Sequence, residues 1–151
     1  LQNPAPDYLI GISSYLTVKN FDFSFAGRAN LKNFVYNNNE SNNALYQGLY
    51  NQSGYTANIL KAVTRTNFRT AQYWSDFYLE DGSFFRMDYI TLGYNINNLV
   101  SGKLKARVNL TVRNAFEITN YNGLDPEVLD GIDNNIYPRP RTYLLGLNLT
   151  F

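Results

Sequence analysis

Four carboxylates gather in one stretch of the chain, and their clustering is the first pattern that could support chemistry. They are Asp125, Glu127, Asp130 and Asp133. Grouped carboxylates are the ligands that Ca²⁺ prefers, but this spacing differs from the Asp-x-Asp-x-Asp-Gly pattern of an EF-hand loop. Pro126 also restrains the backbone between the first two. We therefore expect these side chains to order the turns of a loop, and we predict no metal site and no cofactor.

The residue types that most catalytic sites need are missing. The chain has no Cys and no His, which excludes a thiolate nucleophile, a disulfide framework and a Ser-His-Asp arrangement. Carboxylate pairs for glycoside hydrolysis could be drawn from Asp76, Glu80 and Asp81, but any acidic loop offers such pairs. We predict that this segment is not an enzyme. Its net charge of +1 also suggests no nucleic-acid partner.

Aromatic residues are abundant, with 13 Tyr, 10 Phe and 1 Trp. This excess fits the interfacial girdles of a membrane barrel, and it also fits a sugar-binding protein. Seven of them lie close together in one polar stretch: Tyr46, Tyr50, Tyr55, Tyr73, Trp74, Phe77 and Tyr78. With Asp125 and Glu127, these are our candidates for contacts with a substrate or a partner protein. The alternative is that the aromatic side chains fold their loop on itself.

Alternation of apolar and polar residues predicts the strands that carry these loops. We predict five, at about residues 8–16, 21–36, 84–96, 103–114 and 141–151. The last alternates with period two and ends on an aromatic residue, which is typical of a lipid-facing strand in an outer-membrane barrel. Its length corresponds to a climb of roughly 28 Å when tilted, close to the roughly 25 Å apolar band of such barrels. A soluble sandwich with amphipathic strands is the alternative.

The strand predicted at residues 103–114 decides between these two alternatives. Lys105, Arg107 and Arg113 share one of its faces. Three cations inside a dry sandwich core would be very costly, whereas a water-filled or plugged lumen solvates them. On that basis we expect Arg107→Leu to leave folding largely intact. We predict that Arg28, Lys105, Arg107 and Arg113 face a lumen. The residues predicted to face lipid are Phe23, Phe25, Leu92, Leu104, Val108, Leu110, Leu145, Leu147, Leu149 and Phe151.

The strand predicted at residues 84–96 does not keep a regular alternation of apolar and polar residues. Arg86 and Asp88 have the same parity as Ile90 and the apolar residues that follow it. Either the two charges lie at the outer rim of the barrel, or a β-bulge near Tyr89 exchanges the faces. We favour the rim.

The connections alternate in length. Short turns are expected at residues 18–20 and 97–102, and long loops at residues 37–83 and 115–140. Within the first loop, residues 44–50 or 57–64 could each form a short helix, and a helix there would align Lys61, Arg65 and Arg69 as a solvated basic stripe. Bacterial barrels have short periplasmic turns and long extracellular loops. Five strands cannot close a barrel, so we expect the other strands to come from upstream sequence.

Several separated motifs resemble SusC/RagA-type TonB-linked outer-membrane transporters. The segment DGSFFRMDYITLGY at residues 81–94 carries the strongest resemblance. The others, in the same order as in the family, are NPAPDY at 3–8, KNFDF at 19–23, GLDPE at 123–127, GID at 131–133, YP at 137–138 and PRTYLLGLNLTF at 140–151. The match at residues 112–115 is loose, and residues 37–83 depart most from the family, which leaves the cargo open.

The resemblance implies an all-β, antiparallel transmembrane barrel of about 22 strands, of which this chain would supply the last five, with an N-terminal plug domain that lies upstream and is not in this chain. It further implies location in the bacterial outer membrane among its lipids, a SusD-like surface lipoprotein as a lid, and TonB-driven import of oligosaccharides or peptides through contacts in an absent N-terminal region. The alternative is a barrel of the same scaffold that serves a structural or secretion complex and imports nothing.

Overall fold

The computed structural model describes residues 2–50, 54–99, 104–134 and 137–151. The chain divides into two compact units. The sheet unit comprises Tyr8–Leu31, Phe84–Thr119 and Arg139–Phe151. The loop unit comprises Leu1–Asp7, Lys32–Ser83 and Asn120–Pro138. No helix in the described part of the chain has both the length and the apolar character needed to cross a membrane.

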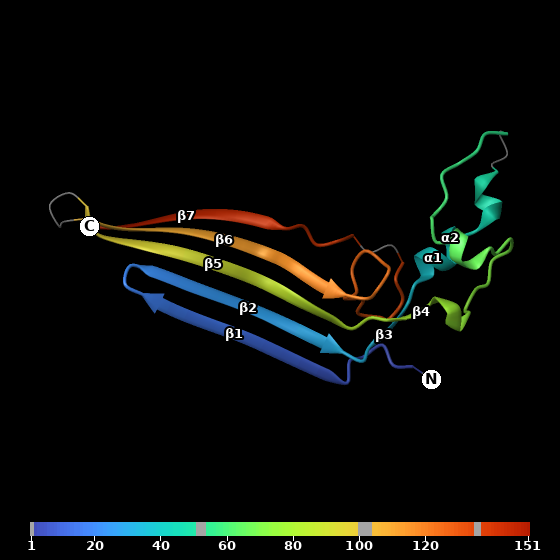
Figure 1. The fold of residues 1–151 in the computed structure, drawn as a ribbon, viewed down its shortest axis with the longest axis horizontal. Coiled ribbons are helices and arrows are strands. Elements are labelled where there is room, and N and C mark those ends of the chain that lie inside the picture. Colours follow the sequence, from blue (N-terminus) through green and yellow to red (C-terminus); the bar gives the residue numbers. More distant parts are fainter. Residues whose placement is uncertain (1, 51–53, 100–103, 135–136) are drawn as a thin grey trace. The chain divides into compact units, whose positions relative to one another are not determined.

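The sheet unit is one antiparallel sheet of five long strands that lie side by side (Figure 1). Its strands are β1 (Tyr8–Val18), β2 (Phe21–Leu31), β5 (Phe84–Leu99), β6 (Leu104–Thr119) and β7 (Thr142–Thr150). The order β1-β2-β5-β6-β7 follows the chain, so the sheet is an up-and-down meander. The all-β, antiparallel prediction is confirmed.

The connections between the strands of the sheet unit include a short turn and two long loops at the predicted places. Lys19 and Asn20 join β1 to β2, and Lys19 has a φ of 54°, the left-handed conformation that tight hairpin turns require. Of the second short connection, predicted at residues 97–102, residues 97–99 belong to β5 and residues 100–102 lie outside the described residues. The chain leaves the sheet unit after β2 and again after β6, where the two long loops are predicted.

The bounds of the strands differ from the predicted ones in the middle of the chain. β2 ends at Leu31 rather than near residue 36, because Lys32 has a φ of 62°, which a continuous strand cannot contain. Residues 34–36 instead form β3 (Phe34–Tyr36), which pairs with β4 (Leu79–Asp81) in a small second sheet. β6 continues five residues beyond the predicted end, so the second long loop begins after Thr119.

A β-bulge in β5 explains the broken alternation, and the preference for the rim is wrong. Ala26 of β2 pairs with Tyr89 and Gly27 pairs with Met87, which leaves Asp88 as the extra residue. The pairing of β5 with β6 shifts at the same place. The shift exchanges the faces, so Met87 is on the apolar face although its parity differs from that of Ile90.

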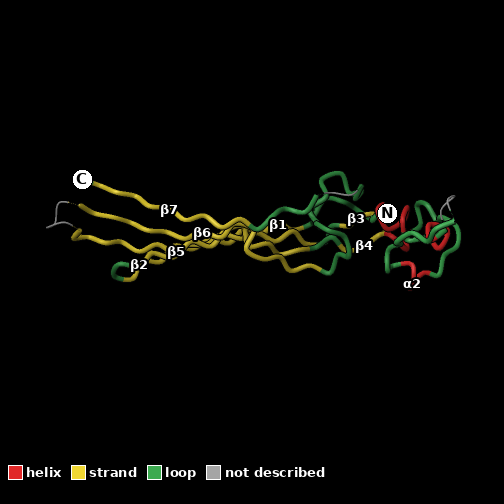
Figure 2. Tube along the Cα trace, turned by 90° about the horizontal axis from the view of Figure 1, so that it is seen from above, coloured by secondary structure: helices red, strands yellow, loops and turns green. Residues whose placement is uncertain are grey.

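The loop unit is built from short elements. It contains β3, α1 (Asn38–Asn43), the 3-10 helix η1 (Tyr46–Leu49), α2 (Val63–Thr66), the 3-10 helix η2 (Asp76–Tyr78) and β4. Figure 2 shows these helices in red. Val35, Tyr121 and Val128 form a buried apolar cluster in this unit.

Both predicted short helices are present only in part. η1 lies inside residues 44–50, while α2 overlaps residues 57–64 only at its first two positions. Since α2 is a single turn, Lys61, Arg65 and Arg69 do not form a helical stripe, and that prediction is wrong. Arg65 instead pairs with Glu40.

Candidate functional site

The sheet unit brings large apolar side chains from all five strands onto one face. Register places Leu16, Phe23, Leu92, Leu110 and Leu145 in one row across the sheet. The next row is Val18, Phe21, Tyr94, Val108 and Leu147. The alternation within each strand adds Phe25, Leu104 and Leu149 to the same face, while Phe151 follows the end of β7.

This apolar face is not covered by other parts of the sheet unit. Leu145 is 79% exposed and Leu147 is 62% exposed. A contiguous apolar surface of this size is unusual for a soluble monomer and is typical of a surface that contacts lipid or another protein. The residues that the sequence predicts to face lipid therefore share one exposed face, although what they contact remains a prediction.

The opposite face is polar and is organised by an ion pair whose carboxylate is buried. Arg107 of β6 reaches Asp22 of β2, with its Nε donating at 3.0 Å and its terminal nitrogen donating at 2.6 Å to the two carboxylate oxygens. Asn95 of β5 donates to the same carboxylate at 3.1 Å. Asp22 is only 2% exposed. The sequence predicts the polar orientation of Arg107 but not its partner, which is distant in the chain.

Gly93 makes this ion pair possible. It lies directly between Asp22 and Asn109 in the register of β2, β5 and β6. A Cβ at this position would overlap the carboxylate of Asp22. A glycine inside a strand commonly marks such a close approach. The structure therefore explains why residue 93 is a glycine: the Asp22 side chain occupies the space that a Cβ would take.

Further charges on the polar face are also paired. Arg28 donates to Asp88 at 2.6 Å, and Arg86 pairs with Glu117. Lys105 and Arg113 share the face of Arg107 because they have the same parity in β6. The four cations predicted to face a lumen thus lie on one face, together with the carboxylates that neutralise two of them.

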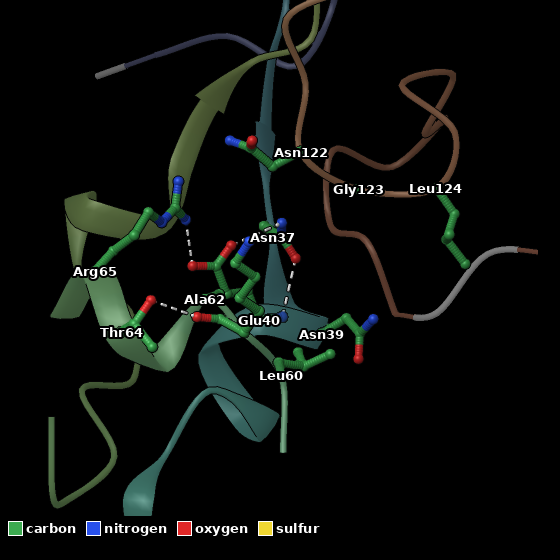
Figure 3. Close-up of a pocket in the computed structure, with 11 residues that line it drawn as sticks. Asn37, Asn39, Glu40, Leu60, Ala62, Thr64, Arg65, Asn122, Gly123 and Leu124 are labelled. Carbon is green, nitrogen blue, oxygen red and sulfur yellow. Dashed lines mark hydrogen bonds and ion pairs between the residues drawn. The ribbon is translucent and has the colours of Figure 1, made fainter. Parts of the chain in front are cut away.

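The loop unit contains a second polar network, centred on Glu40 at the start of α1. Glu40 is 5% exposed and pairs with Arg65, and its backbone N–H donates to the Asn37 side chain at 2.9 Å (Figure 3). Hydrogen bonding to the carboxylate raises the pKa of Arg65 above its usual value. Asn37 also donates to Glu80 at 3.1 Å, and Glu80 accepts two hydrogen bonds from Asn122.

A pocket of about 510 Å³ lies beside this network. Polar side chains and two leucines line it, and Figure 3 shows most of them. The lining includes Asn39, Glu40, Leu60, Arg65, Asn122 and Leu124. Its volume is in the range of small-molecule sites. The sequence did not predict this pocket, because its walls come from three segments that are far apart in the chain.

The seven candidate aromatic residues divide into two groups. Tyr78 is fully buried and its edge packs against Tyr36, so it serves the fold of the loop unit. Trp74 stacks on Tyr36 with centroids 5.3 Å apart, yet it remains 74% exposed. The other exposed members are Tyr46, Tyr50, Tyr55, Tyr73 and Phe77. Burial therefore assigns Tyr78 to the fold of the loop unit, and contact of the exposed members with a substrate or partner stays a prediction.

The acidic segment orders turns, as predicted. Asp125 accepts the backbone N–H of Glu127 at 2.9 Å, and Asp130 accepts that of Ile132 at 3.3 Å. Asp133 accepts the hydroxyl of Tyr121 at 2.7 Å. Burial and this hydrogen bond raise the pKa of Tyr121 far above its usual range. Among the described residues, no three His, Cys, Asp or Glu side chains are grouped as metal ligands.

Comparison with known proteins shows which receptors the chain resembles. No family model matches the chain. The chain is 44% identical to the TonB-dependent receptor SusC of Bacteroides thetaiotaomicron over 156 residues, which is 99% of this chain and 16% of the receptor. It is 31% identical to the TonB-dependent receptor P26 of Formosa agariphila, covering 100% of this chain and 18% of that protein.

Solved structures show the same fold. The structure of the RagAB peptide transporter matches with a TM-score of 0.79 at 22% identity, over 99% of this chain and 18% of that one. A structure of the RagAB peptide importer in the closed-closed state matches with a TM-score of 0.77 at 23% identity, again over 99% and 18%. The chain spans less than a fifth of the length of these proteins. Over nearly its whole length, the chain therefore resembles one segment of the SusC/RagA-type TonB-dependent receptors.

Proposed function

We propose that this chain forms part of the wall of a TonB-dependent importer in the bacterial outer membrane. The apolar face of the sheet unit contacts lipid, and the polar face lines the lumen. The observation that carries the proposal is the registered row of large apolar residues across five strands, which is backed on the other face by the ion pair of Asp22 and Arg107. Such a two-faced sheet suits a barrel wall between hydrocarbon and a wet interior.

The edges of the sheet support completion by other strands. β1 and β7 are its edge strands, and all eleven residues of β1 are exposed. A long, flat, apolar edge strand is an aggregation hazard unless another strand pairs with it. We propose that upstream strands pair with β1 and close the barrel against β7, to about 22 strands in total.

The loop unit takes the extracellular role in this proposal. It carries the exposed Trp74, Tyr73 and Tyr50 and the pocket beside Glu40. Exposed aromatic side chains bind sugar rings or protein surfaces well, because they bury a large area with little loss of side-chain freedom. We propose that these residues, with Asp125 and Glu127, contact the cargo or a SusD-like surface lipoprotein, and that the cargo is an oligosaccharide or a peptide.

Uptake by cells that express the full-length receptor tests this function. Labelled pools of oligosaccharides and of peptides are supplied to cells with an intact or a disrupted TonB system. We expect one pool to enter only when both the receptor and TonB are intact. A receptor that assembles in the outer membrane but imports neither pool would contradict import and favour a structural or secretion role for the same scaffold.

A further inference from the structure

We propose that three arginines on the polar face of the sheet unit form a binding site for an acidic group on the cargo. This inference rests on the proposed function, because it assigns the polar face to the path of the cargo. The site is a pocket of about 360 Å³ inside the sheet unit. Arg28, Asp88, Arg113, Asn114, Arg139, Pro140 and Thr142 line it.

The charges of the lining favour an anion. Three guanidinium groups, from β2, β6 and the segment before β7, line the pocket together with one carboxylate, that of Asp88. Cations therefore outnumber carboxylates among the residues that line it. A negatively charged oxyanion is attracted to guanidinium groups that line one pocket. Guanidinium groups also present paired N–H donors that match the oxygens of carboxylate, sulfate and phosphate.

The ion pair already present leaves access to the pocket. Arg28 donates to Asp88 at 2.6 Å, and their side chains are 38% and 29% exposed. The ion pair of Arg107 differs in the exposure of its carboxylate. Arg107 donates two hydrogen bonds to Asp22, which is only 2% exposed. The two arginines are similarly exposed, but the carboxylate of Asp88 is far more exposed than that of Asp22, so a ligand can reach the pair of Arg28 and Asp88.

The backbone around the pocket is irregular. The register shifts of β5 against β2 and against β6 occur beside Asp88, opposite Asn114. Asn114 has a φ of 49°, and its side-chain amide donates to the carbonyl of Pro140 at 3.0 Å. This bond ties the segment of Arg139 and Pro140 to β6, five residues before that strand ends. Bulges commonly redirect side chains beside binding sites.

The pocket accommodates one unit of an oligomer, such as a uronic acid or an acidic amino acid. The chemistry shared by these ligands is a carboxylate, with sulfate or phosphate esters as close substitutes. We assign the oxyanion to the cargo and not to free inorganic anions, because the pocket lies on the face that the proposed function gives to the import path.

Calorimetric titration of the purified full-length receptor in detergent tests the site. The probes are trigalacturonate, triglutamate, their neutral counterparts methyl-trigalacturonate and triglutamine, and inorganic sulfate. We expect one acidic oligomer to bind more tightly than its neutral counterpart. The double variant Arg113→Gln with Arg139→Gln should weaken that binding by roughly tenfold or more, because each removes charged hydrogen bonds to the ligand.

A matched control removes the same charge elsewhere. Lys105→Gln with Lys19→Gln also deletes two cations, and neither lysine lines the pocket. We expect this variant to bind like the wild type. If both variants weaken binding equally, the acidic oligomer is attracted by the overall positive charge of the receptor. That result would overturn the proposed site. Binding of sulfate but of neither acidic oligomer would overturn the assignment to cargo, and binding of no acidic probe would overturn the inference altogether.

Assembly is checked separately, by the heat-dependent gel mobility of the folded barrel. A receptor that fails to assemble in wild-type form contradicts the proposed barrel wall. A receptor that assembles and imports but shows no acidic preference contradicts only the arginine site.

Discussion

At the scale of single residues, the polar face depends on the approach of Arg107 to Asp22. A charged pair in a sheet that is wet on one side needs a path between strands, and here the missing side chain of Gly93 supplies it. The carboxylate is almost fully buried and accepts three donated hydrogen bonds from two residues. The pair is therefore a structural part of the wall as well as a polar surface.

Gly93→Ala should lower the stability of the receptor by roughly 1–3 kcal/mol, because the new methyl group displaces a buried carboxylate from its donors. The measurement is the thermal unfolding midpoint of the full-length receptor in detergent. Gly11→Ala is the matched control, since a Cβ there meets no atom within 4 Å. Equal stability of the two variants would show that Asp22 does not need the space above Gly93.

Arg107→Leu should destabilise the receptor by roughly 2 kcal/mol, since Asp22 is then left buried with Asn95 as its main donor. This differs from the expectation based on a water-filled lumen alone, in which the substitution is tolerated. The loss is limited because Arg107 is itself about one-third exposed.

The double variant Asp22→Asn with Arg107→Leu tests whether the unpaired carboxylate of Asp22 causes this loss of stability. It should recover part of the stability, because it removes the unpaired charge. The measurement is again the unfolding midpoint of the receptor in detergent. If Arg107→Leu alone unfolds at the wild-type temperature, the ion pair contributes nothing to the fold.

At the scale of elements, the strands could be predicted from sequence because period-two alternation is a local signal. The alternation in β6 and β7 predicted their faces, and the register agrees. The sequence alone does not predict the bulge at Asp88. A broken alternation has two physical explanations, and only the pairing of β2 with β5 distinguishes them. The end of β2 at Leu31 depends on the left-handed backbone of Lys32, a residue type that does not signal it.

The candidate sites were harder to predict than the strands. The pocket beside Glu40 and the partner of Arg107 join residues from separate segments, and a single sequence carries no signal for such contacts. The division of the aromatic residues follows from burial. Tyr78 and Trp74 have similar neighbours in the sequence, yet one is buried and the other is exposed.

The loop unit should lose stability in alkaline solution through Tyr121. Burial and the bond to Asp133 raise its pKa in the folded state, so its contribution is complete below the unfolded value of about 10 and decreases as the pH rises above it. The measurement is limited proteolysis of the segment containing residues 120–134 in the full-length receptor, between about pH 8 and pH 11.

Tyr121→Phe should remove this part of the pH dependence, because it removes the titrating hydroxyl. Tyr137→Phe alters an exposed tyrosine of the same loop and serves as the control. Tyr78, whose pKa burial also raises, accounts for a smaller dependence that both variants retain. The same alkaline loss in Tyr121→Phe as in the wild type would contradict the assignment.

At the scale of the whole molecule, the two faces of the sheet unit must meet two different solvents. The sheet cannot cover its own apolar face, and its edge strands β1 and β7 need partners. A barrel completed by other strands meets both requirements, and the matches to TonB-dependent receptors are consistent with it. The central claim is that the face bearing Leu145 and Leu147 contacts hydrocarbon.

The most direct test compares two adjacent leucines of β7 that lie on opposite faces. Leu145 shares its row with Leu110, and Leu144 pairs with Thr111 on the polar face. Leu145→Arg should impair assembly of the full-length barrel in lipid vesicles by roughly 2–4 kcal/mol, as should Leu147→Arg, while Leu144→Arg should assemble nearly as the wild type does. Folding free energies measured by urea titration in vesicles give the comparison. Equal tolerance of arginine at positions 144 and 145, or a greater loss at position 144, would contradict the account.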